Sequence, residues 1–339
     1  MKQWLDDPIR RFSRRKFLAM ASALGAASKV GYRYAEAADP PPETRSIRLM
    51  ESPIICVAPQ RLAEELLRAE GFTDIRYVRS LNWNEPLPSG EADISMVFAP
   101  PQILQIEAGA PIVVLAGGHI GCVELVAREG IRSTLGLKGK TIAVSDEASD
   151  EKIFISLFLS YVGLDPRRDV QWVIHPVVDT PRLFQEGKVD AFMTAPPFGA
   201  ELRSRKVGRV IVNMTIDRPW SQYFCCLITG NKEFVRRHPI ATKRALRAIL
   251  KANDLCVAQP ERTARLIQSI GLASTYESAL RAIQEIPYAK WREYDPEDAL
   301  RFYALRMREV GMIKHTPQKI ITLGTDWRVL NELKRELKA

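Results

Sequence analysis

Two short stretches of the chain repeat one pattern of polar and apolar positions, in which an acid precedes a short apolar run and a pair of prolines. They are Gly90–Pro101 (GEADISMVFAPP) and Glu186–Pro197 (EGKVDAFMTAPP). Alternate residues of a strand point to opposite faces, and the apolar run is typical of a short buried strand. Proline ends a strand and suits the first turn of a helix. Each stretch is therefore predicted to be a strand followed by a helix, and the repeat predicts two similar lobes.

Apolar runs of strand length alternate with helical patterns twice, over about residues 47–121 and 130–220. This alternation predicts an α/β fold with largely parallel sheets. Further strands are expected over 47–50, 75–78, 111–116, 122–127, 140–144, 170–174, 208–212 and 223–228, a loop over 81–89, and a flexible turn over Gly117–Gly121. Helices are expected up to Glu70 and over 149–162, 180–186, 239–258, 260–270, 275–286, 296–310 and 326–337, where apolar residues recur at helical spacing.

The order of these elements predicts two lobes joined by two crossings of the chain. Residues 47–121 and 229–339 are assigned to the first lobe, and residues 129–221 to the second. Segments 122–128 and 222–228 are expected to lie side by side as a two-strand hinge, which lets the lobes close on a ligand. Ligands of open α/β sheets bind beyond the carboxyl ends of the strands. We therefore expect a ligand between Phe98–Pro101 and Thr194–Pro197.

The first 37 residues have the features of an export signal. A basic segment over Arg10–Lys16 precedes a modest apolar run, and Ala35–Ala37 (AEA) has the small residues of a cleavage site. Ser13–Leu18 (SRRKFL) resembles the twin-arginine motif, by which bacteria export folded proteins. The alternative is an ordinary basic amphipathic N-terminus. We expect a twin-arginine signal peptide over 1–37, a proline-rich linker over 38–46, and a mature protein in the periplasm.

The formal net charge of +9 is concentrated near the N-terminus. Eight Lys/Arg and three Asp/Glu in the first 37 residues contribute +5, and the remaining +4 is spread along the chain. No nucleic-acid-binding motif accompanies this charge, so nucleic acid is not an expected partner. The 339 residues, 46% of them apolar, suffice for two lobes with cores of their own.

The five cysteines are Cys56, Cys122, Cys225, Cys226 and Cys256. An exported protein can form disulfides, but an odd number of cysteines leaves one thiol free. None of the five has C-x-x-C or zinc-site spacing, which favours buried structural thiols. The alternative is a disulfide between Cys122 and Cys225 or Cys226, if the two hinge segments are neighbours.

A set of short motifs recurs in a fixed order over about residues 47–255. The motifs are Ser89–Asp93, Ile106–Val114, Gly130–Ser133, Leu137–Val144, Val162–Pro166 and Glu186–Ala191. In these motifs the chain resembles the periplasmic solute-binding proteins of ABC importers for nitrate, sulfonates and bicarbonate, and their relatives that bind thiamine pyrimidine precursors. The resemblance implies a type II periplasmic binding protein, with two α/β lobes, a two-strand hinge and C-terminal helices. It also implies a monomer that captures a small solute without a cofactor, and delivers it to a permease and ATPase in the inner membrane.

Candidate ligand contacts lie at the ends of the expected strands. They are Ser52, Pro53, Phe98, Ala99 and His119 in the first lobe, Ser145, Asp146, Ala195 and Pro196 in the second, and Trp220 and Tyr223 beside the hinge. For each of them the alternative is ordinary loop or core chemistry. His119 is equally compatible with a surface histidine, and Trp83, Trp220 and Tyr223 with core packing. No metal ligand or catalytic residue is expected.

The loop Ser145–Glu151 carries four carboxylates where family members that bind anions often have small polar residues. Backbone N–H groups at a helix N-terminus favour an anion, but nearby carboxylates repel it. We expect Asp150 and Glu151 to cap the following helix, while Asp146 and Glu147 could face the cleft. The loop therefore favours a neutral or partly cationic solute, such as a heteroaromatic, over a simple sulfonate.

The sequence lacks the usual catalytic signatures, including H-E-x-x-H, G-x-S-x-G and the P-loop. Pyrimidine synthases of the yeast type share the implied fold and use a cysteine-rich loop with iron, of which Cys225-Cys226 matches only a fragment. We therefore expect a binding protein rather than an enzyme. A periplasmic sensor that presents its ligand to a signalling partner is the alternative, since both roles use the same closed form.

Overall fold

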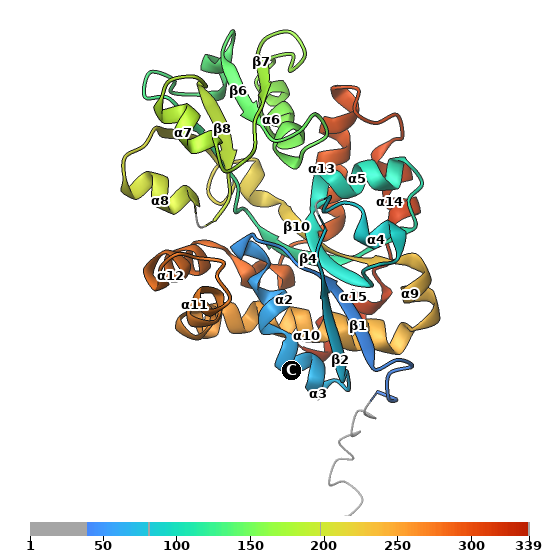
Figure 1. Ribbon diagram of the computed structural model, residues 1–339. Helices are drawn as coiled ribbons and strands as arrows, with labels where there is room; N and C mark the ends of the chain where they lie inside the picture. The colour runs from blue at the N-terminus through green and yellow to red at the C-terminus, as the bar shows by residue number, and fades with distance from the viewer. Residues whose placement is uncertain (1–38, 81, 197, 338–339) are drawn as a thin grey trace, which may run out of the picture. The chain divides into compact units, whose positions relative to one another are not determined.

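The strands of the computed structural model form three sheets in two lobes (Figure 1). The structure describes residues 39–80, 82–196 and 198–337, so the signal peptide expected over 1–37 lies outside the described residues. The contacts of the chain group Pro41–Ala339 into one unit. The strands are β1 (Ser46–Met50), β2 (Asp74–Val78), β3 (Ile94–Phe98), β4 (Ile112–Ile120), β5 (Glu124–Ala127), β6 (Thr141–Val144), β7 (Gln171–Ile174), β8 (Ala191–Thr194), β9 (Arg209–Asn213) and β10 (Phe224–Asn231).

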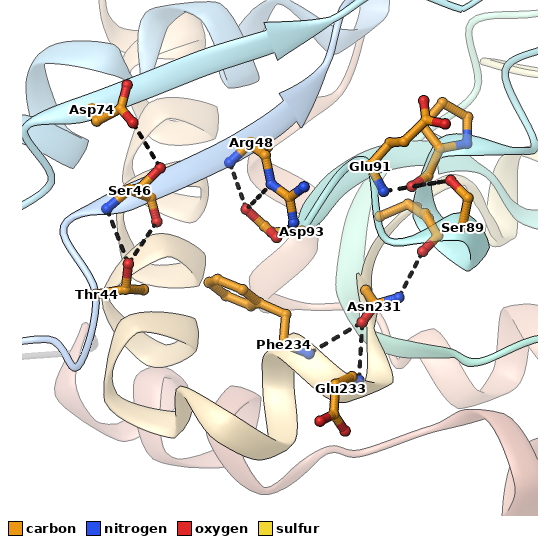
Figure 2. Close-up of polar contacts among 12 residues, drawn as sticks. Thr44, Ser46, Arg48, Asp74, Ser89, Glu91, Asp93, Asn231, Glu233 and Phe234 are labelled. Atoms are coloured by element: carbon orange, nitrogen blue, oxygen red, sulfur yellow. Dashed lines mark hydrogen bonds and ion pairs between the residues drawn. The ribbon is translucent and has the colours of Figure 1, made fainter.

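The first lobe joins two sheets, β1-β2 and β3-β10-β4, through side chains at the start of β3. The Asp93 carboxylate accepts a hydrogen bond from the backbone N–H of Arg48 at 2.7 Å, and Ser95 Oγ accepts one from that of Met50 at 2.6 Å. The Arg48 guanidinium also pairs with the Asp93 carboxylate (Figure 2). These contacts hold β1 beside β3, so the strand order across the lobe is β2-β1-β3-β10-β4.

The second lobe has the same order in a single sheet, β7-β6-β8-β5-β9. Asp190 stands where Asp93 stands in the first lobe, and its carboxylate accepts a hydrogen bond from the backbone N–H of Thr141 at 3.0 Å. In each lobe the aspartate of the repeated stretch therefore binds the first strand of that lobe. The predicted structural repeat is confirmed, because β3 and β8 occupy equivalent positions.

The two crossing strands lie in different sheets. β5 is antiparallel between β8 and β9, and β10 is antiparallel between β3 and β4. The prediction of largely parallel sheets is therefore wrong for β3-β10-β4, where both pairings are antiparallel, and the sheet of the second lobe is mixed. The expected ladder between 122–128 and 222–228 does not form, because each crossing strand pairs within the lobe that it enters. The first crossing instead contacts the turn that follows β9: the Met214 N–H donates to Val123 O at 3.0 Å, and the Cys122 N–H donates to Thr215 Oγ1 at 3.2 Å.

The glycine-rich turn expected over Gly117–Gly121 is largely strand. β4 continues to Ile120, and every one of its residues is buried. A Cβ on Gly117 would lie 2.4 Å from the ring of Phe224 on the neighbouring strand β10. The glycines therefore make room for packing against β10 rather than for a flexible turn.

The helices largely match the expected ranges and cover the sheets (Figure 1). They are α2 (Ala58–Leu62), α3 (Glu64–Ala69), α4 (Pro86–Ser89), α5 (Ala99–Glu107), α6 (Asp150–Tyr161), α7 (Thr180–Gln185), α8 (Phe198–Ser204), α9 (Lys232–Arg237), α10 (Pro239–Ala258), α11 (Pro260–Ser269), α12 (Tyr276–Glu285), α13 (Pro296–Glu309), α14 (Pro317–Gly324) and α15 (Arg328–Glu336), with short 3-10 turns η2 (Ile55–Val57), η3 (Thr134–Leu137), η4 (Trp220–Gln222) and η5 (Tyr288–Arg292). Among the described helices, none combines the length and apolar character that a membrane crossing requires.

Three short helices, α4, α9 and α14, were not expected from the pattern. α9 begins because the side chain of Asn231 accepts hydrogen bonds from the backbone N–H groups of Glu233 and Phe234 (Figure 2). The amide of the same Asn231 donates to Leu87 O in α4 at 2.9 Å. A single N-cap residue thus starts one helix and fastens another to β10.

Candidate functional site

A hollow, which we call the cleft pocket, lies at the carboxyl ends of β1 and β3. It is lined by Met50, Glu51, Ser52, Ile54, Cys56, Val57, Trp83, Asn84, Met96, Val97, Phe98, Asp150 and Cys226. All of these residues belong to the first lobe except Asp150, which begins α6 of the second. The cavity volume is about 30 Å³, which leaves room for about two water molecules. A larger solute therefore needs the lobes to move apart.

A second hollow, the crossing pocket, lies beside the crossings of the chain. Its lining is Cys122, Glu124, Thr194, Ala195, Pro196, Gly199, Arg203, Thr215, Glu285 and Ile286. Glu124 is 6% exposed, and its carboxylate pairs with Arg203 and accepts a hydrogen bond from Asn213 Nδ2 at 2.8 Å. Burial raises the pKa of Glu124, while the Arg203 guanidinium acts in the opposite direction.

Polar contacts between described residues join the lobes around these pockets. The Ile55 N–H of the first lobe donates to Pro196 O of the second at 3.4 Å. Asn84 Nδ2 donates to Asp150 Oδ1 at 3.3 Å, and Arg203 of α8 pairs with Glu285 of α12 at 2.6 Å. The structure is therefore a closed form, and opening the cleft breaks these contacts.

The ligand contacts predicted from the sequence differ in whether they line a pocket. Ser52 and Phe98 line the cleft pocket, and Ala195 and Pro196 line the crossing pocket. Ala99 is buried at the start of α5, and Pro53 is exposed beside the cleft pocket.

The acidic loop Ser145–Glu151 is held by its own hydrogen bonds, since Ser145 Oγ donates to Glu151 Oε2 at 2.9 Å. Asp146 is exposed, and its carboxylate accepts a hydrogen bond from the Ala148 N–H at 2.8 Å. Neither Ser145 nor Asp146 lines a described pocket.

Two of the predicted aromatic contacts pack inside the protein. Trp220 is 4% exposed and lies edge-on against Phe158 and Phe302. The ring of Tyr223 stacks on the ring of Phe302, with the two centroids 4.0 Å apart. The core-packing alternative therefore describes their position. Trp83 differs from both, because it lines the cleft pocket.

Asp150 is the residue of the acidic loop that reaches the cleft pocket, although it was expected to cap α6. The N-cap is Ser149, whose Oγ accepts a hydrogen bond from the Lys152 N–H at 3.3 Å. Asp150 follows it and turns toward Asn84 across the pocket. Burial raises the pKa of Asp150 to about 6, and the neighbouring Glu151 charge adds to the shift. Spacing alone could not assign this role, because two adjacent acids at a helix start are equally suited to capping.

Beneath the cleft pocket lies a buried group of sulfur and imidazole ligands. One ligand atom from each of Cys56, His119, Cys122 and Cys226 lies within 4.8 Å of every other. All four residues are at most 3% exposed, which excludes the surface-histidine alternative for His119. Burial raises the pKa values of the Cys56 and Cys122 thiols to about 11.

The expected closeness of Cys122 and Cys225 is confirmed, but the two are not bonded. Their sulfurs lie 3.4 Å apart, against about 2.05 Å in a disulfide, and all five cysteines are free thiols. The cysteine spacing gave no sign of the ligand group, because its members come from η2, β4, the first crossing and β10.

Comparison with known proteins places these features in a family. Residues 41–271 match the model of the NMT1-like family, which covers more than half of the chain. A candidate binding protein of Brucella abortus (strain 2308) is 25% identical over 175 residues, or 51% of this chain and 54% of that protein. The chain thus spans about half the length of the curated relatives that it matches.

Solved structures with this fold include binding proteins for anions. The periplasmic nitrate-binding protein NrtA of Synechocystis PCC 6803 has a TM-score of 0.73 at 14% identity, over 88% of this chain and 90% of that one. The aliphatic sulphonate-binding protein SsuA of Escherichia coli has a TM-score of 0.66 at 18% identity, over 82% of this chain and 92% of that one. At these identities the likeness shows the fold alone. The chain therefore belongs to the NMT1-like family and has the periplasmic-binding-protein fold of ABC import systems.

Proposed function

We propose that this protein is an extracytoplasmic solute-binding protein, which captures a small neutral or cationic molecule in the cleft pocket and delivers it to an ABC-type permease. The observation that carries the proposal is the position of this pocket between strand ends of one lobe and Asp150 of the other. A solute held there contacts both lobes, so it stabilises a form in which the lobes close around it relative to the open one. That form is wider at the pocket than the one described above, whose cavity has room for about two water molecules. A permease that recognises the closed form then receives only loaded protein.

The charges of the cleft pocket oppose an anionic solute. Its described lining contains the carboxylates Glu51 and Asp150 and no lysine or arginine. Glu51 is balanced by Arg61 at 2.9 Å and by Arg79, whereas the partner of Asp150 is the neutral amide of Asn84. Asp150 also occupies the start of α6, where backbone N–H groups otherwise favour an anion. The nitrate and sulfonate named for the structural neighbours therefore suit this pocket poorly.

The aromatic lining favours a flat or partly apolar solute. Trp83 and Phe98 both line the cleft pocket, and Phe98 is held edge-on against Phe154 at 5.4 Å between ring centroids. Aromatic faces bind heteroaromatic rings and cations, and a nearby carboxylate strengthens the preference for a cation. A heteroaromatic amine combines both features.

The cellular setting of this proposal rests on the N-terminal sequence. Export through the twin-arginine machinery would deliver a folded protein to the periplasm, where it can reach the permease from outside the inner membrane. Whether residues 1–37 are cleaved is tested by N-terminal sequencing of the exported protein. Cleavage after Ala37 is the expected result.

The test is a thermal-shift screen followed by calorimetric titration. Nitrate and alkanesulfonates form one arm, and pyrimidines, heteroaromatic amines and aromatic acids form the others. A ligand that binds only the folded state raises the melting temperature. We expect neutral or cationic heteroaromatics to do so, with Asp150→Asn and Trp83→Ala each weakening the binding. Asp146→Asn is the matched control, because Asp146 is exposed and asparagine can still accept the Ala148 hydrogen bond. Tight binding of nitrate or an alkanesulfonate would refute the proposed charge preference.

A sensor role uses the same closed form, so the partner discriminates between the two. Co-purification with a permease supports import, and co-purification with a histidine kinase supports sensing. For the enzyme alternative, incubation of the protein with each ligand that shifts its melting temperature should leave the ligand unchanged by mass spectrometry.

A further inference from the structure

The ligand group beneath the cleft pocket has the composition of a metal site. Its members are three thiols and one imidazole, contributed by Cys56 in η2, His119 in β4, Cys122 at the first crossing and Cys226 in β10. All four side chains are essentially excluded from solvent. A set of three sulfurs and one nitrogen is a ligand set that holds Zn²⁺ in tetrahedral structural sites.

His119 is oriented as a metal-binding histidine is. Its Nδ1 lies 3.2 Å from Ile120 O, so this nitrogen carries the proton and donates it to the carbonyl. The other nitrogen, Nε2, then has a free lone pair, and it has no hydrogen-bond partner among the described residues. Leaving a buried acceptor unpaired is costly. Because Nδ1 is held by the carbonyl, Nε2 is the nitrogen left to bind an ion. A backbone carbonyl on the other ring nitrogen is the usual second shell of a metal-binding histidine.

The backbone conformation of Cys122 is a second, independent unusual feature of the ligand group. Its backbone has φ +97, a conformation that residues other than glycine rarely adopt. Such a conformation is strained and persists only where surrounding contacts impose it. Here the Cys122 N–H is held by Thr215 Oγ1 at 3.2 Å, and this geometry leaves the thiol among the other ligands.

We propose that Cys56, His119, Cys122 and Cys226 bind one Zn²⁺ in a closed tetrahedral site. Zn–S bonds of about 2.3 Å set the ligand atoms about 3.8 Å apart, so the observed group needs only a small contraction. The neutral imidazole binds through Nε2, and the three thiols bind as thiolates. Binding therefore releases three protons and leaves a complex with one negative charge.

The site connects the first crossing to the first lobe. Cys122 lies in the crossing, whereas the other three ligands belong to the first lobe. Cys56 and Cys226 line the cleft pocket and Cys122 lines the crossing pocket, so an ion can reach the site when the lobes open. Once bound, the metal fixes the end of the crossing about which the lobes move. This role is separate from solute binding, and the two tests are independent.

The remaining cysteines provide matched controls. Cys225 Sγ lies 3.4 Å from Cys122 Sγ but does not belong to the ligand group, and Cys256 is buried at 1% exposure in α10. Substituting either with serine removes a buried thiol and leaves the four ligands in place. Substituting Cys226 or His119 removes a ligand.

The experiment is metal binding by the full, reduced chain. The protein is equilibrated with ZnCl₂ under nitrogen and dialysed, and zinc per chain is measured by mass spectrometry. We expect one zinc per chain in the wild type, Cys225→Ser and Cys256→Ser, and less than about a tenth of that in Cys226→Ser and His119→Ala. Cobalt replacing zinc should give the thiolate charge-transfer absorption and visible bands of tetrahedral Co²⁺.

Because a ligand variant can fail to fold, X-ray absorption on the zinc-loaded wild type provides a second measurement. The expected first shell is three sulfurs at about 2.3 Å and one nitrogen at about 2.0 Å. A shell of oxygens and nitrogens, which would mean an adventitious ion only, overturns the proposal. So does full zinc retention in folded Cys226→Ser and His119→Ala.

Discussion

Removing the charge of Asp150 is expected to stabilise the unliganded protein at neutral pH. Asp150 is half-buried at the cleft pocket, and the desolvation of its carboxyl group there raises its pKa from an ordinary 3.8 to about 6. Between pH of about 4 and about 6 the folded chain therefore keeps a proton that the unfolded chain has lost. The free energy of unfolding falls as the pH rises across this window and levels off above it. At pH 7.5 Asp150 is ionised in the folded protein, and its charge lowers the free energy of unfolding by the full amount.

The magnitude follows from the size of the shift. A shift of about two pKa units corresponds to about 3 kcal/mol. Asp150 is the first residue of α6, and the helix N-terminus offsets up to about 1 kcal/mol of this cost. The Asp150→Asn variant keeps an oxygen that can accept from Asn84, so it removes the charge with little other change. We expect a gain of about 1–2 kcal/mol at pH 7.5, or a melting temperature higher by about 3–6 °C.

The assay is thermal unfolding of the wild type, Asp150→Asn and the control Asp146→Asn at pH 7.5 and pH 4. The gain in Asp150→Asn should largely disappear at pH 4, where the wild-type carboxyl is already protonated in the folded state. Asp146→Asn should follow the wild type at both values. An equal shift at both pH values, or a lower melting temperature at pH 7.5, would show that the buried charge does not carry the effect.

Two further predictions concern the fold. Asp93→Ala should lower the unfolding free energy by about 2–4 kcal/mol, because it removes the charged acceptor of the part-buried Arg48 N–H and the ion-pair partner of the Arg48 guanidinium. Asp74→Ala, at the start of the edge strand β2, should change chemical denaturation little. Gly117→Ala should cost about 1–3 kcal/mol, because its Cβ would lie 2.4 Å from the Phe224 ring. Gly130→Ala is the matched control in the same assay, since a Cβ there meets no atom within 4 Å, and equal effects of the two glycine variants would contradict the packing argument.

The architecture followed from the sequence because it rests on local periodicity. The repeated aspartate, apolar run and diproline predicted equivalent strands, and the structure has them as β3 and β8. The C-terminal helices were equally accessible, because an amphipathic helix records its buried face in residues three and four apart. Strand partners were not accessible in this way. The ladder of β10 with β3 and β4 depends on residues more than a hundred positions apart in sequence, and no local pattern encodes it.

The candidate site could be predicted from the sequence only in part, because it also depends on contacts between residues far apart in the chain. Strand ends were predicted to face the cleft, and Ser52 and Phe98 do line the cleft pocket. Trp220 and Tyr223 were assigned to the cleft from their place beside the hinge, but they pack with Phe302 of α13, a helix whose docking position local spacing does not specify. The ligand group around His119 was missed because its members meet only after both crossings are in place.

The repeat also explains why the unusual chemistry gathers at the crossings. In both lobes an incoming strand inserts between the third and fourth strands of the host sheet, as β10 does in the first lobe and β5 in the second. This insertion brings the end of β4, the start of β10 and the short link at Cys122 to the floor of the cleft. The lobes repeat one another through Asp93 and Asp190, which serve the fold. Asp150 and the cysteines of the ligand group take no part in this repeated contact. They lie at the cleft pocket or beneath it.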